Sequence, residues 1–400
     1  MERNIRLYPW FRFAQGLLFW QAVWFLYFQS ALSASQAILL YVIYDIATTA
    51  LEVPSGYMSD RWGRRRTLVA SALAGLLAAL AFSFGNSFAA FALAQVAMGA
   101  HSAFTSGTDS ALLYESLAAE GRAAETEAQE LKAWRASFSA LALAALAGGA
   151  LAYGSMKWPF YAAIAGFSLL LALALAFREP RHTRPEPPQG GELMRFASLR
   201  AAFAQPVLLW LFALGLVMYA LSHVPFVFGQ PYIAAALSAA GFTQEAPLVS
   251  GAVTAAMMAV SLAVSLVAAP VRRAIGLPAI LLAALALQVA VIGALAATAS
   301  ALAILALLLR MVPNSLSQPF ILARIQPLLA SESRATYLSL RSFAGRLLFA
   351  ATLWLASGAA SGQGAMEFAQ IRFVLGLYVL AGLAILAVLA LWARRVPLEP

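Results

Sequence analysis

The chain has 400 residues, of which 62% are hydrophobic and 11% are charged, and its mean hydropathy is +0.80. Soluble domains carry about 25% charged residues, so this composition excludes a soluble globular protein and indicates a chain that lies mostly in lipid. The net charge of +9 is spread over short loops, which argues against a nucleic-acid-binding domain, and the sequence has no cysteine for disulfides or thiol catalysis.

Apolar runs long enough to cross a membrane recur along the whole chain. A helix needs about 20 apolar residues to cross the hydrocarbon core. In the first half the runs lie at 9–30, 36–58, 67–84, 88–115, 132–153 and 158–177, and in the second half at 206–236, 247–269, 277–298, 300–329, 335–357 and 369–393. The sequence therefore predicts an all-α integral membrane protein with twelve transmembrane helices in two pseudo-symmetric six-helix bundles.

The two bundles are predicted at 1–178 and 206–400, with a cytoplasmic linker at 179–205. The linker region opens with the polar, Pro- and Gly-rich stretch REPRHTRPEPPQGG, which is typical of an exposed connection. Its second part, from Leu193 to Phe203, has apolar residues at helical spacing. Two alternatives remain open for it: a short helix in the membrane interface, and an extension of the seventh span.

Positive charge is distributed unevenly between the two sides of this topology. Almost all loop arginines fall on the side of the linker and both termini, whereas the opposite side has little beyond Lys157 and Arg372. The positive-inside rule then predicts that the linker and both termini are cytoplasmic. The short external loops and the excess of arginine over lysine favour the inner (plasma) membrane of a bacterium.

The connection between the second and third spans has the sequence GYMSDRWGRRRTL. Its glycines allow a tight turn, its arginines anchor the chain at the cytoplasmic surface, and its aspartate can pair with them or cap the next helix. The residues that form this pattern are Gly56, Asp60, Arg61, Gly63, Arg64 and Arg65. Their identity and their position together resemble the signature loop of the major facilitator superfamily.

The resemblance implies the fold of that superfamily and a secondary transporter that works by alternating access, in which this loop closes the cytoplasmic side. We expect Glu115, near the cytoplasmic end of the fourth span, to support the loop by pairing with Arg61 or Arg64. A weaker counterpart, AAPVRRAIG, aligns Gly276 with the second glycine of the loop. Arg273 stands there in the place of the acid, so we expect an asymmetric gate.

Two departures from the family pattern bear on function. Many proton-coupled members carry an arginine four residues before a glycine in the fourth helix, and here Gln95 precedes Gly99 at that distance. Many exporters carry a Gly-Pro pair in the fifth helix, and here Gly148 and Gly149 occur without the proline. Both departures weaken the case for proton-driven export and leave the fold assignment untouched.

Ionisable residues inside the spans are candidate functional residues, because each costs about 2.5 to 3.5 kcal/mol at the bilayer centre. Polar residues share one helical face on two spans: Tyr41, Asp45, Thr48 and Glu52 on the second, and His101, Thr105 and Asp109 on the fourth. The proton-coupling candidates are Asp45, Asp109, His101 and Glu52. Asp45 is preferred for its mid-depth position, and a hydrogen-bonded structural role is the alternative for His101.

The spans of the second half carry bases, in contrast to the acids of the first half. These bases are His223, Arg310, Arg324, Arg341 and Arg346. At 1.5 Å per residue, Asp45 and Arg346 both lie about 18 Å from the cytoplasmic ends of their helices, and Glu52 and Arg341 lie about 10 Å from theirs. We expect these two pairs to form between the halves and to break during transport. Static pairs between packed helices are the alternative.

Polar and aromatic residues of several spans are candidates for a substrate cavity. They are Gln21, Trp24, Tyr41, Thr105, His223, Arg310, Asn314 and Arg346. The three histidines are too scattered to predict a metal site, and neither a cofactor nor an enzymatic activity is expected. The expected partners are a small-molecule substrate, protons and the lipid bilayer, and a monomer suffices because the site lies within one chain.

The sequence lacks a GxxxxGK phosphate loop, so an ion gradient rather than ATP is expected to drive transport. The resemblance extends to bacterial drug/proton antiporters, and the favoured function is proton-coupled efflux of amphipathic, drug-like compounds. The alternative is a transporter of an organic anion, such as a siderophore, sugar phosphate or carboxylate, with Arg310 and Arg346 as a clamp. A non-transporting receptor or lipid-handling protein on the same fold is a third possibility.

Overall fold

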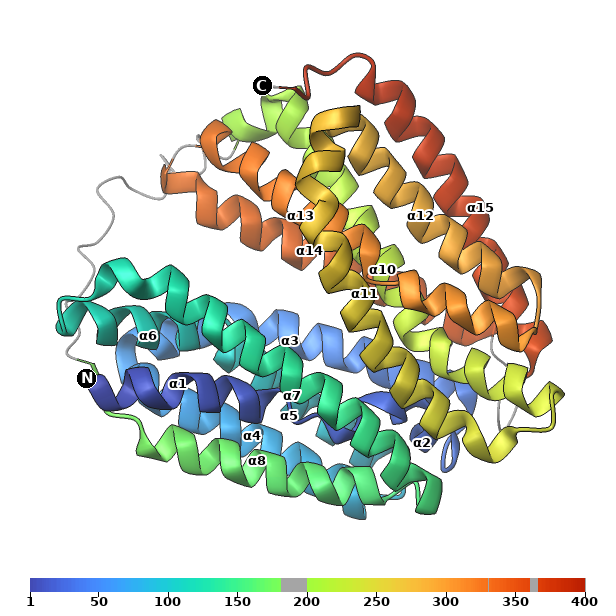
Figure 1. Cartoon of the computed structure of the whole chain (residues 1–400), viewed down its shortest axis with the longest axis horizontal. Coiled ribbons are helices and arrows are strands. Elements are labelled where there is room, and N and C mark those ends of the chain that lie inside the picture. The colour runs from blue at the N-terminus through green and yellow to red at the C-terminus, as the bar shows by residue number, and fades with distance from the viewer. Residues whose placement is uncertain (181–199, 330, 360–365, 400) are drawn as a thin grey trace. The chain divides into compact units, whose positions relative to one another are not determined.

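The computed structural model describes residues 1–180, 200–329, 331–359 and 366–399, without the side chains of some helical residues, Asp60 among them. Within these ranges the regular elements are helices (Figure 1). The division of the chain at 179–205 stays a prediction, because most of that range lies outside the described residues. The contacts divide the chain into two compact units, which are described separately below.

The first unit comprises the described residues of Met1–Arg184 and Gln244–Ala255. Its helices are α1 (Glu2–Gln15), α2 (Trp24–Gln29), α3 (Ala34–Trp62), α4 (Arg64–Phe84), α5 (Phe88–Thr105), α6 (Thr108–Ala119), α7 (Thr126–Gly154) and α8 (Trp158–Ala176). α4 packs against α5 and α8, and α1 packs against α7. The unit is therefore held together by contacts between consecutive helices as well as between helices distant in sequence.

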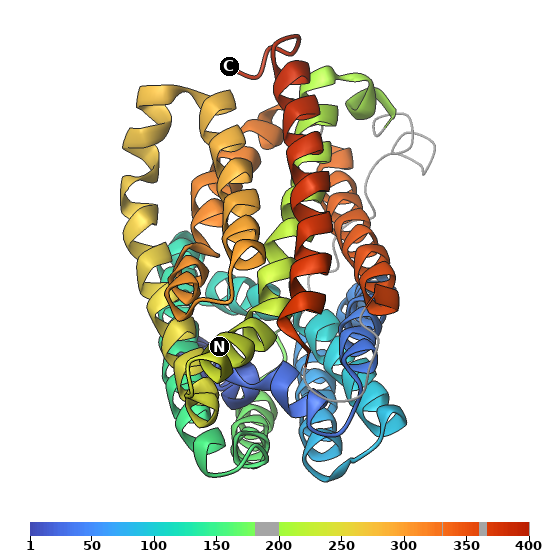
Figure 2. The same cartoon turned by 90° about the vertical axis from the view of Figure 1, so that its right-hand side faces the viewer.

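The second unit comprises the described residues of Pro185–Thr243, Ala256–Ala360 and Met366–Pro400. Its helices are α10 (Pro206–Ala239), α11 (Ala246–Ile275, whose first residues are grouped with the first unit), α12 (Leu277–Ala297), α13 (Val312–Ile325), α14 (Ser331–Ala359) and α15 (Phe368–Ala393). α10 packs against α14, and α12 packs along α15, as Figures 1 and 2 both show.

Ten helical segments of the described chain are long and apolar enough to cross a membrane. They correspond to ten of the predicted spans, with the fourth formed by α5 and α6 and the tenth by a 3₁₀ helix (Ala301–Leu309) and α13. The two other predicted spans are the first, at 9–30, and the eleventh, which lies within α14. At 29 residues α14 is long enough to span, so the structure is consistent with twelve crossings.

The first predicted span, 9–30, is wrong as one continuous helix. α1 ends at Gln15, a 3₁₀ turn covers Phe19–Ala22, and α2 begins at Trp24. The interruption coincides with a close approach to α7, since a Cβ added to Gly148 would lie 1.7 Å from the Phe19 carbonyl oxygen. Only a residue without a side chain fits at that crossing. Gly148 therefore serves backbone packing in this chain.

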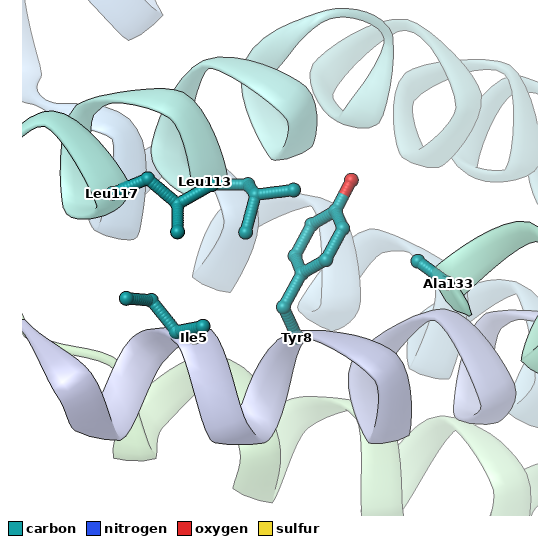
Figure 3. Packing of buried hydrophobic residues seen from close by; sticks show 5 residues of the cluster. All are labelled: Ile5, Tyr8, Leu113, Leu117 and Ala133. Carbon is teal, nitrogen blue, oxygen red and sulfur yellow. The ribbon is translucent and has the colours of Figure 1, made fainter. Parts of the chain in front are cut away.

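The N-terminal helix packs antiparallel to α6. Ile5 and Tyr8, three residues apart on one face of α1, lie with Leu113 and Leu117 of α6 in a buried cluster that Ala133 of α7 completes (Figure 3). The Asn4 side-chain amide donates to Ser116 Oγ at 2.9 Å. Further along both helices, this register brings Arg12 of α1 to Asp109 of α6.

An aromatic cluster fills the interior of the first unit around the fully buried Trp20. The rings of Phe160 and Phe167, both on α8, lie 5.6 Å from Trp20, and Trp24 lies 5.7 Å from it. The Trp24 ring is also 6.1 Å from the ring of Tyr41 on α3. Trp24 and Tyr41, two candidates for a substrate cavity, thus contribute to the packed interior.

Candidate functional site

A cavity of about 460 Å³ opens within the first unit, between α1, α3, α5, α6 and α7. This volume lies in the range of about 300 to 1,000 Å³ that is typical of small-molecule sites. Its charged lining residues are Arg12, Asp109 and Glu130, and its polar and aromatic lining includes Gln15, Tyr44, His101, Thr105 and Trp134. Three predicted residues, His101, Thr105 and Asp109, therefore line one cavity.

Asp109 lies at the break between α5 and α6. Gly107 has a φ of +74°, a left-handed conformation that glycine adopts readily, and α6 restarts at Thr108. Asp109 thus falls in the first turn of α6, where the helix dipole stabilises a negative charge. Its Oδ1 accepts a hydrogen bond from the Ser110 N–H at 2.8 Å. Its Oδ2 accepts one from Arg12 Nη1, which makes an ion pair between a buried carboxylate and a half-buried guanidinium.

Two residues of α7 face Tyr8 and Arg12 of α1. Glu130 and Trp134 are four residues apart on α7, as Tyr8 and Arg12 are on α1, so each pair shares a helical face. The Tyr8 hydroxyl lies 3.3 Å from both carboxylate oxygens of Glu130. The Arg12 guanidinium lies over the Trp134 ring, 5.5 Å from its centroid. Among the described residues, the cavity lining has two carboxylates and one guanidinium, a formal charge of −1.

The sequence predicts none of the four residues Tyr8, Arg12, Glu130 and Trp134 as part of a site. One signal in the sequence could have indicated them. On each helix the two residues are four positions apart, which places both side chains on one face. Spacing alone does not say which face of α1 meets which face of α7. That information comes from the packing of Tyr8 against Leu113 and Ala133.

His101 is held by hydrogen bonds between α5 and α4. Its Nδ1 donates to the Ser71 carbonyl oxygen at 3.0 Å, and the Ser71 hydroxyl lies 2.6 Å from Thr105 Oγ1. The imidazole also makes an edge-to-face contact with Phe167 of α8, at 5.2 Å between ring centroids. This geometry favours the structural role that was the alternative for His101, although the residue also lines the cavity.

The face of α3 that carries Asp45 and Thr48 is buried, so these polar side chains are kept away from lipid. Asp45 is 4% exposed and Thr48 is 2% exposed. The Thr48 hydroxyl donates to the Tyr44 carbonyl at 2.8 Å, which satisfies it within its own helix. The expected pairs of Asp45 with Arg346 and of Glu52 with Arg341 would join the two units, and they stay predictions.

The signature loop is a short break between α3 and α4, at Gly63, which has a φ of +104°. Glu115 Oε1 lies 3.0 Å from Arg64 Nε, so Arg64 is a partner of Glu115. The Arg64 guanidinium also donates to Ser59 Oγ at 2.7 Å. Arg61 contacts Tyr57 one turn earlier on α3, and the Asp60 side chain lies outside the described residues.

A carboxylate that the sequence does not predict caps the helix after this loop. Glu179, just after α8, accepts hydrogen bonds from the backbone N–H groups of Arg64 at 2.6 Å and Arg65 at 3.1 Å. These groups belong to the first turn of α4, where helical N–H groups lack intrahelical partners. Glu179 thereby connects the end of the sixth predicted span to the start of α4 within the first unit.

The second unit repeats this arrangement at the counterpart loop. Gly276 has a φ of +83°, and Glu399, after α15, accepts a hydrogen bond from the Leu277 N–H at the start of α12, at 2.5 Å. Its other carboxylate oxygen lies 2.9 Å from Arg272 Nη2. Glu179 and Glu399 each precede a proline in the sequence. That shared Glu-Pro pair was the available signal of the repeat.

Three predicted residues of the second unit gather along α10. His223 lies between Tyr219 and Phe226 on this helix, and its Nδ1 is 2.7 Å from the Tyr219 carbonyl oxygen. Arg346 lies over the Tyr219 ring at 5.8 Å, and Arg310 lies over the Phe226 ring at 5.3 Å. The two arginines therefore stack on rings that flank one histidine.

The remaining candidates of the second unit are dispersed. Arg341 packs along Gly215 of α10, where an added Cβ would lie 2.9 Å from its Cδ. Its Nη1 is buried without a hydrogen-bond partner in the described part of the chain. Asn314 lies half-buried in α13.

The chain is similar to solved membrane transporters over nearly its whole length. It matches the nucleoside transporter NupG with a TM-score of 0.77 at 13% identity, covering 97% of this chain and 99% of that one. It matches a D-xylose-proton symporter with a TM-score of 0.70 at 14% identity, covering 96% and 97%. An auto-inhibited peptide transporter of the POT family gives a TM-score of 0.70 at 12% identity, covering 100% and 99%. At these identities the likeness shows the fold alone.

The sequence itself identifies the family. No curated protein gives a significant match to the chain. Residues 11–353, however, match the sequence model of the Major Facilitator Superfamily. That match covers most of the chain and all but the last of its predicted spans. The chain therefore belongs to the major facilitator superfamily and is a multi-pass membrane transporter rather than an enzyme.

Proposed function

We propose that this secondary transporter exports amphipathic organic cations in exchange for protons, by alternating access. One observation carries the proposal. The described lining of the cavity in the first unit has the carboxylates of Asp109 and Glu130, the guanidinium of Arg12 and the aromatic ring of Trp134. An excess carboxylate and an aromatic ring are the two features that attract an organic cation.

The same carboxylates can carry the proton. Asp109 faces Arg12 and has Glu130, Tyr8 and His101 around it. Protonation of either acid removes the negative charge that a cation needs, so a proton and a substrate compete for one site. Binding of protons from the more acidic side would release the cation there, which is the exchange that an exporter requires. Asp45, buried on α3, is the second candidate for the proton.

The loops capped by Glu179 and Glu399 support the proposed gate. In each loop, a left-handed glycine precedes a helix whose first turn is hydrogen-bonded to the glutamate. The glutamate thereby connects this turn to the chain segment that follows α8 or α15. Such groups would move as rigid ends when the halves rock. The distribution of loop arginines in the sequence supports a cytoplasmic location for these loops and for both termini, in an inner membrane.

Binding can be tested on the detergent-purified protein by thermal stability. A ligand at 100 times its dissociation constant adds about 2.7 kcal/mol to a reversible unfolding equilibrium. Lipophilic cations such as tetraphenylphosphonium should raise the melting temperature at pH 8, raise it less at pH 6, and lose their effect in Asp109→Asn. Equal stabilisation by cations at both pH values, or none in the wild type, would contradict the proposal.

A specific observation also favours a second function, transport of an organic anion. Arg310 and Arg346 flank His223 in the second unit and could hold a carboxylate or phosphate. Under this alternative, organic anions such as citrate or a sugar phosphate stabilise the protein, and Arg346→Gln abolishes the effect. The same thermal assay with a matched panel of cations and anions decides between the two functions.

A further inference from the structure

We propose that Arg12 is a built-in occupant of the cation site, a tethered guanidinium that a substrate cation must displace from the face of Trp134. This inference rests on the proposed function and deepens it. It assigns to Arg12 a role in setting affinity, and it places the substrate cation between Trp134 and Glu130. The ligand class is an organic cation with an apolar body, such as an aryl ammonium or phosphonium.

Arg12 already makes the two kinds of contact that such a ligand would make, one with the Trp134 ring and one with a carboxylate. Its guanidinium lies 5.5 Å from the centroid of the Trp134 ring, within the distance of a cation–π interaction. The same group pairs with Asp109, whose side chain is 5% exposed. A ligand cation entering the cavity therefore meets a positive charge on the aromatic surface that it needs.

The contacts of Arg12 are incomplete in a way that suits displacement. Arginine and a carboxylate commonly pair through two parallel hydrogen bonds. Here Nη1 bonds to Asp109, while Nε is buried without a hydrogen-bond partner in the described part of the chain. Asp109 uses its other oxygen for the Ser110 N–H. A guanidinium with an unsatisfied donor is held less firmly than one in a fully paired structural bridge.

Glu130 remains available to the ligand after Arg12 has neutralised Asp109. Within the described part of the chain, its carboxylate accepts a long hydrogen bond from the Tyr8 hydroxyl, at 3.3 Å, and Glu130 lies one helical turn from Trp134 on the same face of α7. A cation placed between them would contact the ring and the carboxylate together. The stem of Arg12 lets its guanidinium leave the ring while the pair with Asp109 persists.

The inference predicts tighter binding when the tethered charge is removed. The dissociation constant of tetraphenylphosphonium is measured by isothermal titration calorimetry at pH 8, on the full chain in detergent. Arg12→Gln should bind at least about tenfold more tightly than the wild type, since a unit charge a few ångströms away contributes more than that factor at protein dielectric constants. Arg6→Gln is the matched control, because Arg6 lies on the same helix with a 78% exposed side chain and pairs with Glu2.

A second comparison tests the inference if Arg12→Gln does not fold because the charge of Asp109 is left unpaired. Asp109→Asn and the double variant Arg12→Gln/Asp109→Asn both lack the buried acid, and only the first retains the competing guanidinium. The double variant should bind the cation more tightly than Asp109→Asn. Equal or weaker binding without Arg12, in either comparison, would overturn the inference while leaving the proposed function intact. Absence of cation binding in every variant and in the wild type would overturn both.

Discussion

Glu179 and Glu399 occupy equivalent positions in the two units. Glu179 follows α8 and Glu399 follows α15, and each accepts a backbone N–H at the start of the helix that follows a left-handed glycine. The nearest carboxylate oxygens would lie 2.7 Å and 2.9 Å from a Cβ added to Gly63 and Gly276, respectively. The internal repeat of the chain is therefore expressed in a hydrogen-bonded cap as well as in the helices.

Removing the cap in the first unit should lower stability. Hydrogen bonds to a charged group contribute about 1.5 to 3 kcal/mol, so Glu179→Ala should destabilise the protein by about 1 to 3 kcal/mol. Glu179→Gln retains one acceptor oxygen and should lie between the alanine variant and the wild type. The melting temperature in detergent measures both effects. Equal melting temperatures for all three proteins would show that the cap is dispensable.

The Arg12–Asp109 pair should show strong coupling in a double-mutant cycle. Removing one partner of a buried ion pair costs about 3 to 5 kcal/mol, because the other charge is left buried and unpaired. Each single variant, Arg12→Gln and Asp109→Asn, should therefore be less stable than the double variant. Chemical denaturation of the detergent-solubilised protein gives the free energies of unfolding of the wild type and the three variants. Additive effects would mean that the two residues do not interact in solution.

Gln95 should tolerate an apolar replacement. It is fully buried in α5, and both atoms of its side-chain amide lack a hydrogen-bond partner in the described part of the chain. A buried unsatisfied polar group costs about 1 to 3 kcal/mol, so Gln95→Met should keep or raise the melting temperature. A marked loss of stability, or loss of transport with stability retained, would instead show that the amide holds a water molecule or a substrate.

The start of α7 should respond to acid. The Arg122 hydrogen bond lowers the pKa of Glu125 below its ordinary value. A depressed folded-state pKa contributes stability above the unfolded-state value and loses it as the pH falls through the folded-state value. The contribution of Glu125 to the melting temperature should therefore be constant from pH 8 to pH 6 and should decline below about pH 4.5. Glu125→Gln should show a shallower decline, and an identical acid profile would contradict this assignment.

The sequence predicts what depends on local composition and fails where distant segments meet. Apolar runs give most of the spans, and the pattern around Gly63 gives the turn between α3 and α4, because both signals lie within a few residues. The Arg12–Asp109 pair joins residues 97 positions apart, and no local pattern specifies the register of α1 on α6. Glu179 lies at the start of a stretch whose composition is typical of an exposed linker, so its capping role is visible only in the structure.

The interruption of the first span shows the same limit. The residues of 9–30 are apolar enough for one helix, yet α1 ends at Gln15, and α7 approaches the backbone that follows at Phe19 through Gly148. His101 is the reverse case. Its periodicity on the fourth span suggested proton transfer, whereas its contacts with Ser71 and Phe167 favour packing.

In the proposed exchange, an organic cation and a proton compete at the acids of the first unit. The most direct test reconstitutes the protein in liposomes that contain a pH-sensitive dye, at equal pH on both sides, and adds tetraphenylphosphonium outside. Exchange predicts that the lumen becomes alkaline as the cation enters, that Asp109→Asn abolishes this change, and that the control Arg6→Gln retains it. No change of lumenal pH when the cation is added, or proton movement driven only by organic anions and lost in Arg346→Gln, would contradict this exchange.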